Sequence, residues 1–140
     1  RHFIRLRIMA SIFTKIIKGD IPSYKIAEDD RFFAFLDINP LGEGHTLVVP
    51  KEEIDYIFDL NAEVLADMMV FAQKIAKAIK EVIPCNRIGV SVIGLEVPHA
   101  HIHLVPINTL GDINFSKTRP QISKEVFEDL SQKISQKVIL

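Results

Sequence analysis

The sequence is poor in the features that mark a disulfide scaffold, a membrane protein or a nucleic-acid-binding protein. It has one cysteine among 140 residues, Cys85, so an intrachain disulfide framework is excluded and a reducing compartment, the cytoplasm, is favoured. Basic and acidic side chains nearly balance, 17 against 18, so we expect no nucleic acid partner and no membrane partner. No apolar run approaches the roughly 20 residues that span a bilayer.

What the chain does have is the composition of one ordinary globular domain. Hydrophobic residues make up 48% and charged residues 25% of it, which is enough apolar material for a core. Residues 1–8 carry three arginines and precede Met9. We interpret 1–8 as a non-native or misassigned N-terminal extension, because it lacks the apolar run of a secretory signal, and we expect 9–140 to form a single domain.

Hydrophobic periodicity predicts three helices and five strands in the order α-β-β-β-α-β-β-α. The helices are expected at 12–18, at 61–82 and at about 123–138, the middle one being long and amphipathic. The strands are expected at 24–28, 31–37, 45–50, 88–93 and 99–107, with the nearly all-apolar 45–50 in the centre. Hairpins joined by a helix favour an α+β fold, a mostly antiparallel sheet of about five strands with helices on one face.

Three of the five histidines fall within five residues. His99, His101 and His103 alternate with small or apolar side chains. This is the period of a strand, in which every second side chain points to the same face. An extended conformation would therefore place all three imidazoles on one face, roughly 6.5–7 Å apart along the strand.

Such a histidine face admits three interpretations. The side chains could be partly buried polar residues of a half-solvated sheet. They could bind a catalytic zinc ion, although the following residues 104–106 hold no carboxylate and the nearest acid, Glu96, precedes the run. They could act by nucleophilic catalysis, because a neutral imidazole nitrogen attacks phosphorus well near pH 7 while its neighbours hold phosphate oxygens.

Several motifs together resemble the histidine triad (HIT) family. The run from His99 to Val105 matches the pattern His-φ-His-φ-His-φ-φ, where φ is apolar. The segments 11–22, 35–40 and 44–51 are similar to the N-terminal half of that family, in the same order. The resemblance covers about 12–106, and it is strongest to the small single-domain branch of nucleotide-binding hydrolases.

The resemblance implies catalytic roles for four histidines. His101, the central one, would attack the α-phosphorus of a nucleotide and form a covalent nucleotidyl-histidine. His103 would contact the phosphate, and His99 would support His101 or help the leaving group to depart. His45 matches a further family histidine upstream of the triad and could complete a proton relay.

The resemblance also implies a nucleotide-binding set. Asp37 would accept hydrogen bonds from both ribose hydroxyls, which suits the two acceptor oxygens of a carboxylate. Ile38 would pack on the base, which in this family tends to be a purine. The rest of the base slot would come from apolar residues, namely Phe13, Ile16, Phe35 and Leu47.

The chain departs from the family pattern at two places. Where many relatives carry polar residues that touch the phosphate, this sequence has Leu95 and Glu96. We include Glu96 in the binding set, where it could act as an acid, orient a histidine, favour a cationic leaving group or face solvent. Where some bacterial relatives carry Cys-x-x-Cys for zinc, this chain has Ser11 and Thr14, so we expect no metal ion and no other cofactor.

The resemblance therefore implies a hydrolase or transferase that cleaves the α-phosphate bond of a purine nucleotide conjugate. The conjugate would be a phosphoramidate or a dinucleoside polyphosphate, and the product a nucleoside monophosphate. Leu95 and Glu96 keep an alternative open, a nucleotide-binding sensor or interaction module with little catalysis. Relatives of this size also imply a homodimer that pairs through the long helix and an edge strand.

Overall fold

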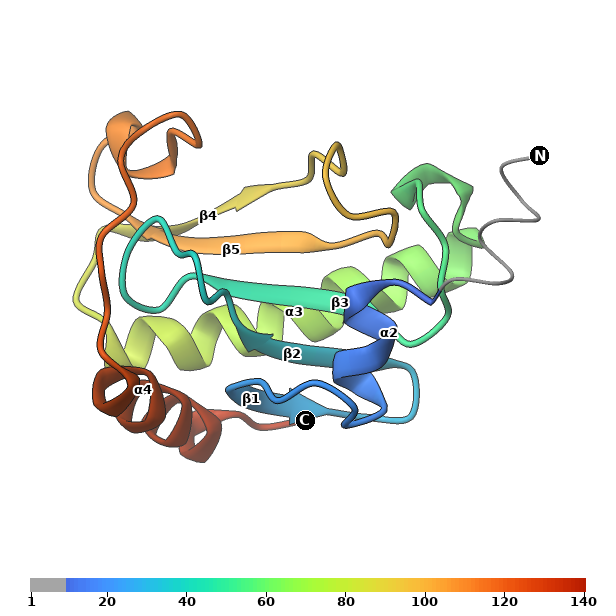
Figure 1. Ribbon diagram of the computed structural model, residues 1–140, viewed down its shortest axis with the longest axis horizontal. Coiled ribbons are helices and arrows are strands. Elements are labelled where there is room, and N and C mark those ends of the chain that lie inside the picture. Colours follow the sequence, from blue (N-terminus) through green and yellow to red (C-terminus); the bar gives the residue numbers. More distant parts are fainter. Residues whose placement is uncertain (1–9) are drawn as a thin grey trace.

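The computed structural model describes residues 10–140, and its elements follow the predicted order (Figure 1). The expectation for 1–8 lies outside the described residues. The helices are α2 (Ile12–Ile17), α3 (Ala62–Val82) and α4 (Lys124–Lys137). The strands are β1 (Lys25–Glu28), β2 (Phe32–Leu36), β3 (Thr46–Pro50), β4 (Arg87–Ser91) and β5 (Ile102–Ile107). Short 3-10 helices, η1 (Ile57–Asp59) and η2 (Leu110–Ile113), lie in two of the connections.

The five strands form one antiparallel sheet in the order β1-β2-β3-β5-β4. The predicted α+β fold is confirmed, and so is the central position of β3. In the pairing of β3 with β5, Leu47 lies opposite His103. Because the two strands are antiparallel, the loop between β2 and β3 lies beside the end of β5, and the segment before β5 lies beside the end of β3.

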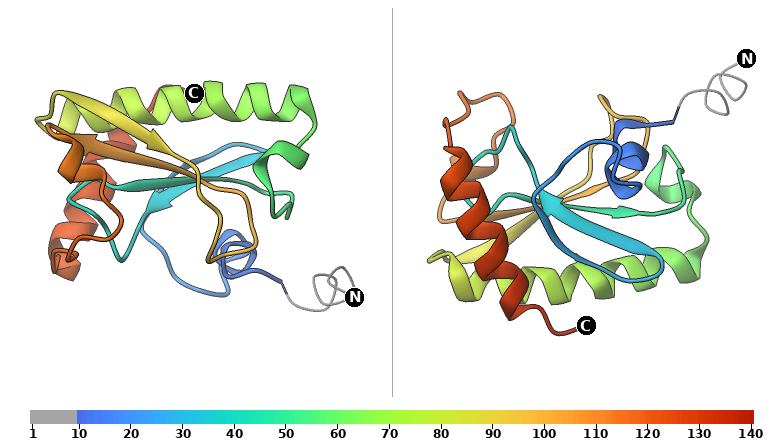
Figure 2. Two further views of the ribbon diagram at one scale, coloured as in Figure 1. Left: turned by 90° about the horizontal axis from the view of Figure 1, so that it is seen from above. Right: turned by 60° about the horizontal axis from the view of Figure 1, so that its bottom comes forward.

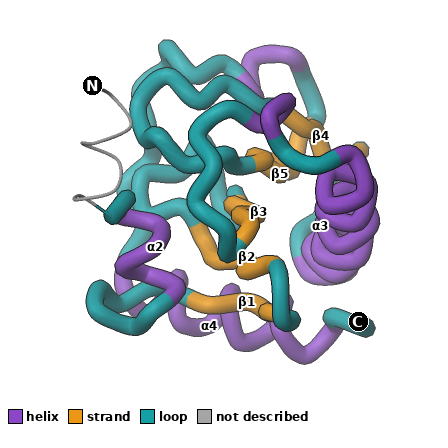
Figure 3. The backbone as a smooth tube through the Cα atoms, turned by 90° about the vertical axis from the view of Figure 1, so that its right-hand side faces the viewer, coloured by secondary structure: helices purple, strands orange, loops and turns teal. Residues whose placement is uncertain are grey.

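The two faces of the sheet carry different packing. In β2, Phe32 and Ala34 belong to the main core with α3 and α4, while Phe33 and Phe35 belong to a smaller cluster with Phe13 of α2. Figure 3 and the left view of Figure 2 show α2 and α3 on opposite sides of the sheet. The expectation of helices on one face is therefore wrong for α2, because β2 is apolar on both faces and each face needs a cover.

The apolar stripe of α3 contributes more buried residues to the main core than any other helix. The predicted Met68, Phe71, Ala72, Ile75 and Ile79 are all buried. Asn61 begins the helix, its side chain accepting a hydrogen bond from the backbone N–H of Glu63. No helix among residues 10–140 is long and apolar enough to cross a membrane.

The start of β5 differs from the prediction. The strand begins at Ile102, so His99 and His101 lie in the segment before it. The reason is a change of partner: pairing with β3 stops at Ile102, and the N–H of Ala100 donates instead to the carbonyl of Ile54 in the loop after β3. His45 likewise lies just before β3, and β4 ends at Ser91 rather than at Ile93.

Replacing Ile75 by alanine tests the core. Ile75 is fully buried between α3 and the sheet, so we expect the Ile75→Ala variant to lose about 2–5 kcal/mol of unfolding free energy through lost burial and an unfilled cavity. The matched control is Ile139→Ala at an exposed position, with an expected change within about 0.5 kcal/mol. Urea unfolding measures both, and equal losses would contradict the placement of Ile75.

Candidate active site

A cavity of about 430 Å³ opens on the α2 face of the sheet. Its walls come from α2, the β2–β3 connection, β3, the loop after β4, β5 with the residues just before it, and the chain between η2 and α4. The lining residues are Ile12, Phe13, Asp37, Asn39, Leu47, Ile93, Gly94, Leu95, Glu96, Val97, His101, His103, Phe115 and Arg119.

Six of the eleven residues expected from the sequence line this cavity: Phe13, Asp37, Leu47, Glu96, His101 and His103. The others lie around it. His45 and His99 are buried behind the lining, and Ile16 and Phe35 pack against Phe13. Ile38 is 73% exposed and does not line the cavity.

The ring of His101 is held by the carbonyl of His99. His101 Nδ1 lies 2.8 Å from that oxygen, and because a carbonyl only accepts, Nδ1 carries the proton of the neutral ring. Nε2 is then left with a free lone pair. The ring packs edge-on against Phe13, with 5.0 Å between ring centroids, and is buried. The backbone therefore presents His101 as the tautomer that a nucleophile needs.

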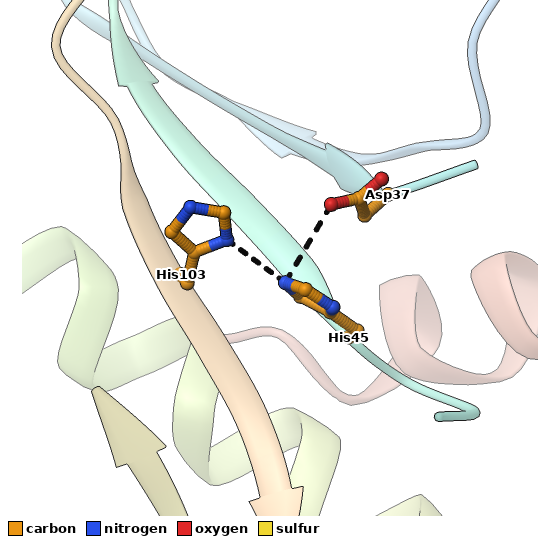
Figure 4. Close-up of side chains that lie close together, drawn as sticks. All are labelled: Asp37, His45 and His103. Atoms are coloured by element: carbon orange, nitrogen blue, oxygen red, sulfur yellow. Dashed lines mark hydrogen bonds and ion pairs between the residues drawn. The ribbon is translucent and has the colours of Figure 1, made fainter. Parts of the chain in front are cut away.

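A second backbone group determines which ring nitrogen carries the proton in His45 and in His103. The N–H of Leu41 donates to His45 Nδ1 at 2.9 Å, so the proton of neutral His45 must sit on Nε2. His45 Nε2 lies 2.9 Å from His103 Nδ1, which must accept (Figure 4). His103 then carries its own proton on Nε2. It is therefore a hydrogen-bond donor beside the lone pair of His101, with 4.9 Å between the two ring centroids.

Burial keeps His45 and His103 neutral. Desolvation, with nearby positive charge as a smaller cause, lowers the pKa of His45 to about 3 and that of His103 to about 4. Asp37 Oδ2 lies 3.6 Å from His45 Nε2, but a neutral His45 makes this a polar contact and not an ion pair. Burial also raises the pKa of Asp37, against the hydrogen bond that its Oδ1 accepts from the N–H of Asn39.

His99 occupies a separate hydrogen-bond network behind the cavity. Its Nε2–H donates to the carbonyl of Pro50 at 2.7 Å, and its Nδ1 accepts from the Ser11 hydroxyl at 2.7 Å. Both ring nitrogens are thus engaged, and burial lowers the pKa of the ring. This arrangement favours support of His101, through the His99 carbonyl, over direct help to a leaving group.

Ser11 and Thr14, at the positions compared with zinc cysteines, are tied to Glu53. The carboxylate of Glu53 accepts from the N–H of Ser11 at 2.8 Å and from the Thr14 hydroxyl. Burial alone would raise the pKa of Glu53, but the hydrogen bonds from Thr14 and Ser11 outweigh it and the pKa is lowered. Because Ser11 also caps α2, the network joins that helix to the histidine segment.

Within residues 10–140, one cluster has the composition of a metal site. Ligand atoms of Asp37, His45 and His103 all lie within 4.8 Å of one another. Two nitrogens on a tetrahedral zinc ion would be about 3.3 Å apart, since Zn–N bonds are about 2.0–2.1 Å long. The separation of 2.9 Å between His45 and His103 suits a hydrogen bond better. Metal binding at His45 Nε2 would also require the loss of the Leu41 contact or of the ring proton.

Sequence reasoning missed Phe115 and Arg119. The Phe115 ring packs edge-on against His103, with 4.8 Å between centroids. The Arg119 guanidinium donates to the carbonyls of Asn39, at 2.6 Å, and Phe115, at 3.2 Å. The basic pair Lys117 and Arg119 was the available signal, but nothing local connects it to a site 16 residues earlier in the chain.

Comparison with known proteins identifies relatives of the whole domain. The HIT domain family model matches residues 18–110. An uncharacterised HIT-like protein of Borreliella burgdorferi is 35% identical over 135 residues, 91% of this chain and 97% of its own. The adenosine 5'-monophosphoramidase of Schizosaccharomyces pombe is 36% identical over 132 residues, 93% of this chain and 99% of its own.

A solved structure agrees with these relatives. A Hit-like protein of Bartonella henselae superposes with a TM-score of 0.78 and 32% identity, covering 92% of this chain and 97% of that one. The fold and the sequence motifs thus point to the same family.

Acidification tests the neutral histidines. Folded His45 and His103 take up protons only near pH 3 and 4, whereas in the unfolded chain each does so near its ordinary pKa of 6.5. The unfolded state therefore binds more protons below pH 6.5. The stability that these groups contribute is complete above that pH and falls on acidification, by up to about 1.4 kcal/mol per pH unit for each histidine.

Urea unfolding at pH 7 and pH 5 measures this loss. The matched control is the double variant His45→Gln/His103→Gln, which retains the contributions of all other titrating groups. We expect it to show a smaller loss between the two pH values. An equal loss of unfolding free energy in both proteins would contradict the neutral state of His45 and His103.

Proposed function

The chain belongs to the HIT domain family, and on that premise we propose that it cleaves the α-phosphate bond of a purine nucleotide conjugate through a covalent nucleotidyl-histidine. The product is a nucleoside monophosphate. The observation that carries this proposal is the tautomer pair in the cavity, an Nε2 lone pair on His101 beside an Nε2–H on His103. The phosphoramidase name of the Schizosaccharomyces pombe relative supports this class of hydrolysis.

In the first step, His101 Nε2 forms a bond to the α-phosphorus and the bond to the leaving group breaks. The electron pair goes to the leaving group, and an amine takes a proton from water as it departs. His101 keeps its Nδ1 proton against the His99 carbonyl, so the intermediate is a nucleotidyl-imidazolium that this carbonyl stabilises. His103 Nε2–H donates to a phosphate oxygen, where negative charge grows in the transition state.

In the second step, water attacks the phosphorus and the bond from phosphorus to His101 Nε2 breaks. The electron pair returns to the imidazole, and the proton of the water leaves to solvent. His45 acts by holding His103 in the donor tautomer, because its own Nε2–H is directed to His103 Nδ1. In this scheme His45 and His99 are positioning residues.

The nucleoside is held by Asp37 and by the apolar residues of the cavity. Asp37 has one oxygen engaged by Asn39 and a second one available for the ribose hydroxyls. Phe13 and Leu47 line the cavity as the apolar base slot. Ile16 and Phe35 support Phe13 from behind, and Ile38, which is exposed, would contact a base only at the rim.

A nucleotide sensor is the second candidate function. Leu95, 89% exposed, and Glu96 lie in the cavity wall at the segment where many relatives are expected to carry polar phosphate contacts. Weaker contacts of this segment with the phosphate would favour nucleotide binding without rapid hydrolysis. In that case the same cavity would bind nucleoside monophosphate and the covalent step would be negligible.

Removing the nucleophile separates these functions. We expect purified protein to hydrolyse adenosine 5'-phosphoramidate, and His101→Ala to lower kcat by on the order of 10⁴-fold while AMP still binds. Quenching with an alkaline denaturant during turnover, which preserves the acid-labile bond from phosphorus to nitrogen, should trap one adenylyl group on the peptide that contains His101, detected by mass spectrometry.

Leu110→Ala is the control and should keep full activity, because Leu110 is exposed on η2 and does not line the cavity. Full activity in the His101→Ala variant would contradict the mechanism. Tight AMP binding without turnover in the unaltered protein would establish the sensor.

We also propose a homodimer and a cytoplasmic location, the latter favoured by the lone free thiol of Cys85. The dimer is supported by exposed apolar side chains on α3, Met69 and Val70, and on the edge strand β4, Val90. Two copies paired through these elements would share one continuous sheet.

Light scattering tests the pairing. The 15.9 kDa chain should give twice that mass, and Val70→Asp/Val90→Asp should shift it to a monomer. Leu110→Asp, at an exposed apolar position on η2, is the matched control and should keep the dimer mass. A monomer mass for the unaltered chain would contradict the proposal.

A further inference from the structure

The segment that carries the proposed nucleophile lies outside the sheet. β5 pairs with β3 only from Ile102 onward, so the three residues before it have no strand partner. The end of β3 and the loop after it hold these residues instead. His99 Nε2–H donates to the carbonyl of Pro50 at 2.7 Å, and the N–H of Ala100 donates to the carbonyl of Ile54 at 2.7 Å. The orientation of the nucleophile therefore depends on contacts outside the strand ladder.

The other nitrogen of the His99 ring is held by α2. The Ser11 hydroxyl donates to His99 Nδ1 at 2.7 Å and accepts from the N–H of Thr14 at 3.0 Å. On the same helix, the Phe13 ring packs edge-on against His99 and His101, with 5.8 Å and 5.0 Å between ring centroids. A helix of six residues is too short to be stable by itself, so α2 needs an anchor elsewhere in the fold.

Glu53, in the loop after β3, supplies that anchor. Its Oε1 accepts from the N–H of Ser11 at 2.8 Å and from the Thr14 hydroxyl, both at the start of α2. Figure 1 shows α2 beside the end of β3, from which this loop leaves. The donor and acceptor of each step toward the nucleophile are fixed. Glu53 accepts from Ser11, Ser11 donates to the His99 ring, and the His99 carbonyl accepts from His101.

We propose that Glu53 is a positioning residue for His101, which keeps the segment 99–101 in the conformation that leaves the His101 Nε2 lone pair free. The carboxylate holds the first turn of α2, and the helix then places Ser11 on the His99 ring and Phe13 on both rings. Glu53 does not line the cavity, so it acts through these contacts and not on the substrate. This inference rests on the proposed function and adds a residue that its reaction scheme does not use.

Kinetics test the position of the nucleophile. We expect Glu53→Ala to lower kcat for adenosine 5'-phosphoramidate by about 10-fold or more, because a nucleophile that is slightly misplaced attacks slowly. KM should change by less than about 3-fold, because the cavity wall is intact. Glu53→Gln should recover most of kcat, since an amide oxygen can accept both hydrogen bonds.

The matched control is Glu52→Ala. Glu52 is exposed on the same loop and makes no side-chain hydrogen bond within the described residues 10–140, so this variant removes the same charge and should keep full activity. A Glu53→Gln variant as impaired as Glu53→Ala would overturn the hydrogen-bonded link. Equal kcat values in Glu53→Ala and the unaltered protein would overturn the positioning role.

A spectroscopic readout separates positioning from stability. In protein labelled with ¹⁵N-histidine, the ring nitrogens of His101 report its tautomer, and we expect a single Nδ1–H form in the unaltered protein. Glu53→Ala should shift these signals toward a mixture of tautomers. Thr14→Val, which removes one of the two donors and keeps the shape of the side chain, should shift them less in the same direction and decides the question if Glu53→Ala does not fold.

A purely structural Glu53 predicts a different result. Urea unfolding would then show a lower unfolding free energy for Glu53→Ala, while the folded variant keeps the single tautomer of His101, and the inference is overturned. The spectrum also keeps this question separate from catalysis. If the unaltered protein hydrolyses no nucleotide conjugate, the proposed function fails, and the tautomer of His101 in the two variants alone decides about Glu53.

Discussion

A peptide carbonyl can only accept a hydrogen bond and a peptide N–H can only donate one, and this constraint governs the histidines of the cavity. The carbonyl of His99 fixes the proton of His101, and the N–H of Leu41 fixes those of His45 and, through it, His103. Neither backbone group titrates. The fold therefore determines that His101 Nε2 has the lone pair and that His103 Nε2 carries the proton. Burial lowers the pKa of His45 and His103, so both keep these tautomers near neutral pH.

This arrangement depends on a difference in packing between the two faces of the sheet. The face toward α3 and α4 is a mainly apolar core, and the other face combines the cluster around Phe13 with buried histidines. No buried side-chain nitrogen or oxygen in residues 10–140 lacks a hydrogen-bond partner. Ser11 shows how this is achieved, because it caps α2 and also donates to His99. The short helix and the histidine segment therefore stabilise one another.

The charged groups of the cavity come from parts of the chain that are far apart. Asp37 follows β2, Glu96 lies in the loop before β5, and Arg119 belongs to the segment before α4. Groups of opposite charge thus lie in one cavity around the histidines. In the proposed function, the imidazoles would perform the reaction and the flanking charged groups would contact the substrate.

The sequence by itself determined the order of the elements, the stripe of α3, the central β3 and the histidine run, because these follow from periodicity within a few residues. The resemblance to the family implied Asp37, His101 and His103 as site residues, and all three line the cavity. Only the tertiary structure decided the histidine tautomers and the start of β5 at Ile102. It also decided that α2 packs on the second face of the sheet, and that Glu53 contacts Ser11 and Arg119 contacts Asn39. Each of these depends on a contact between distant segments, and no local pattern encodes which distant backbone group will meet a given side chain.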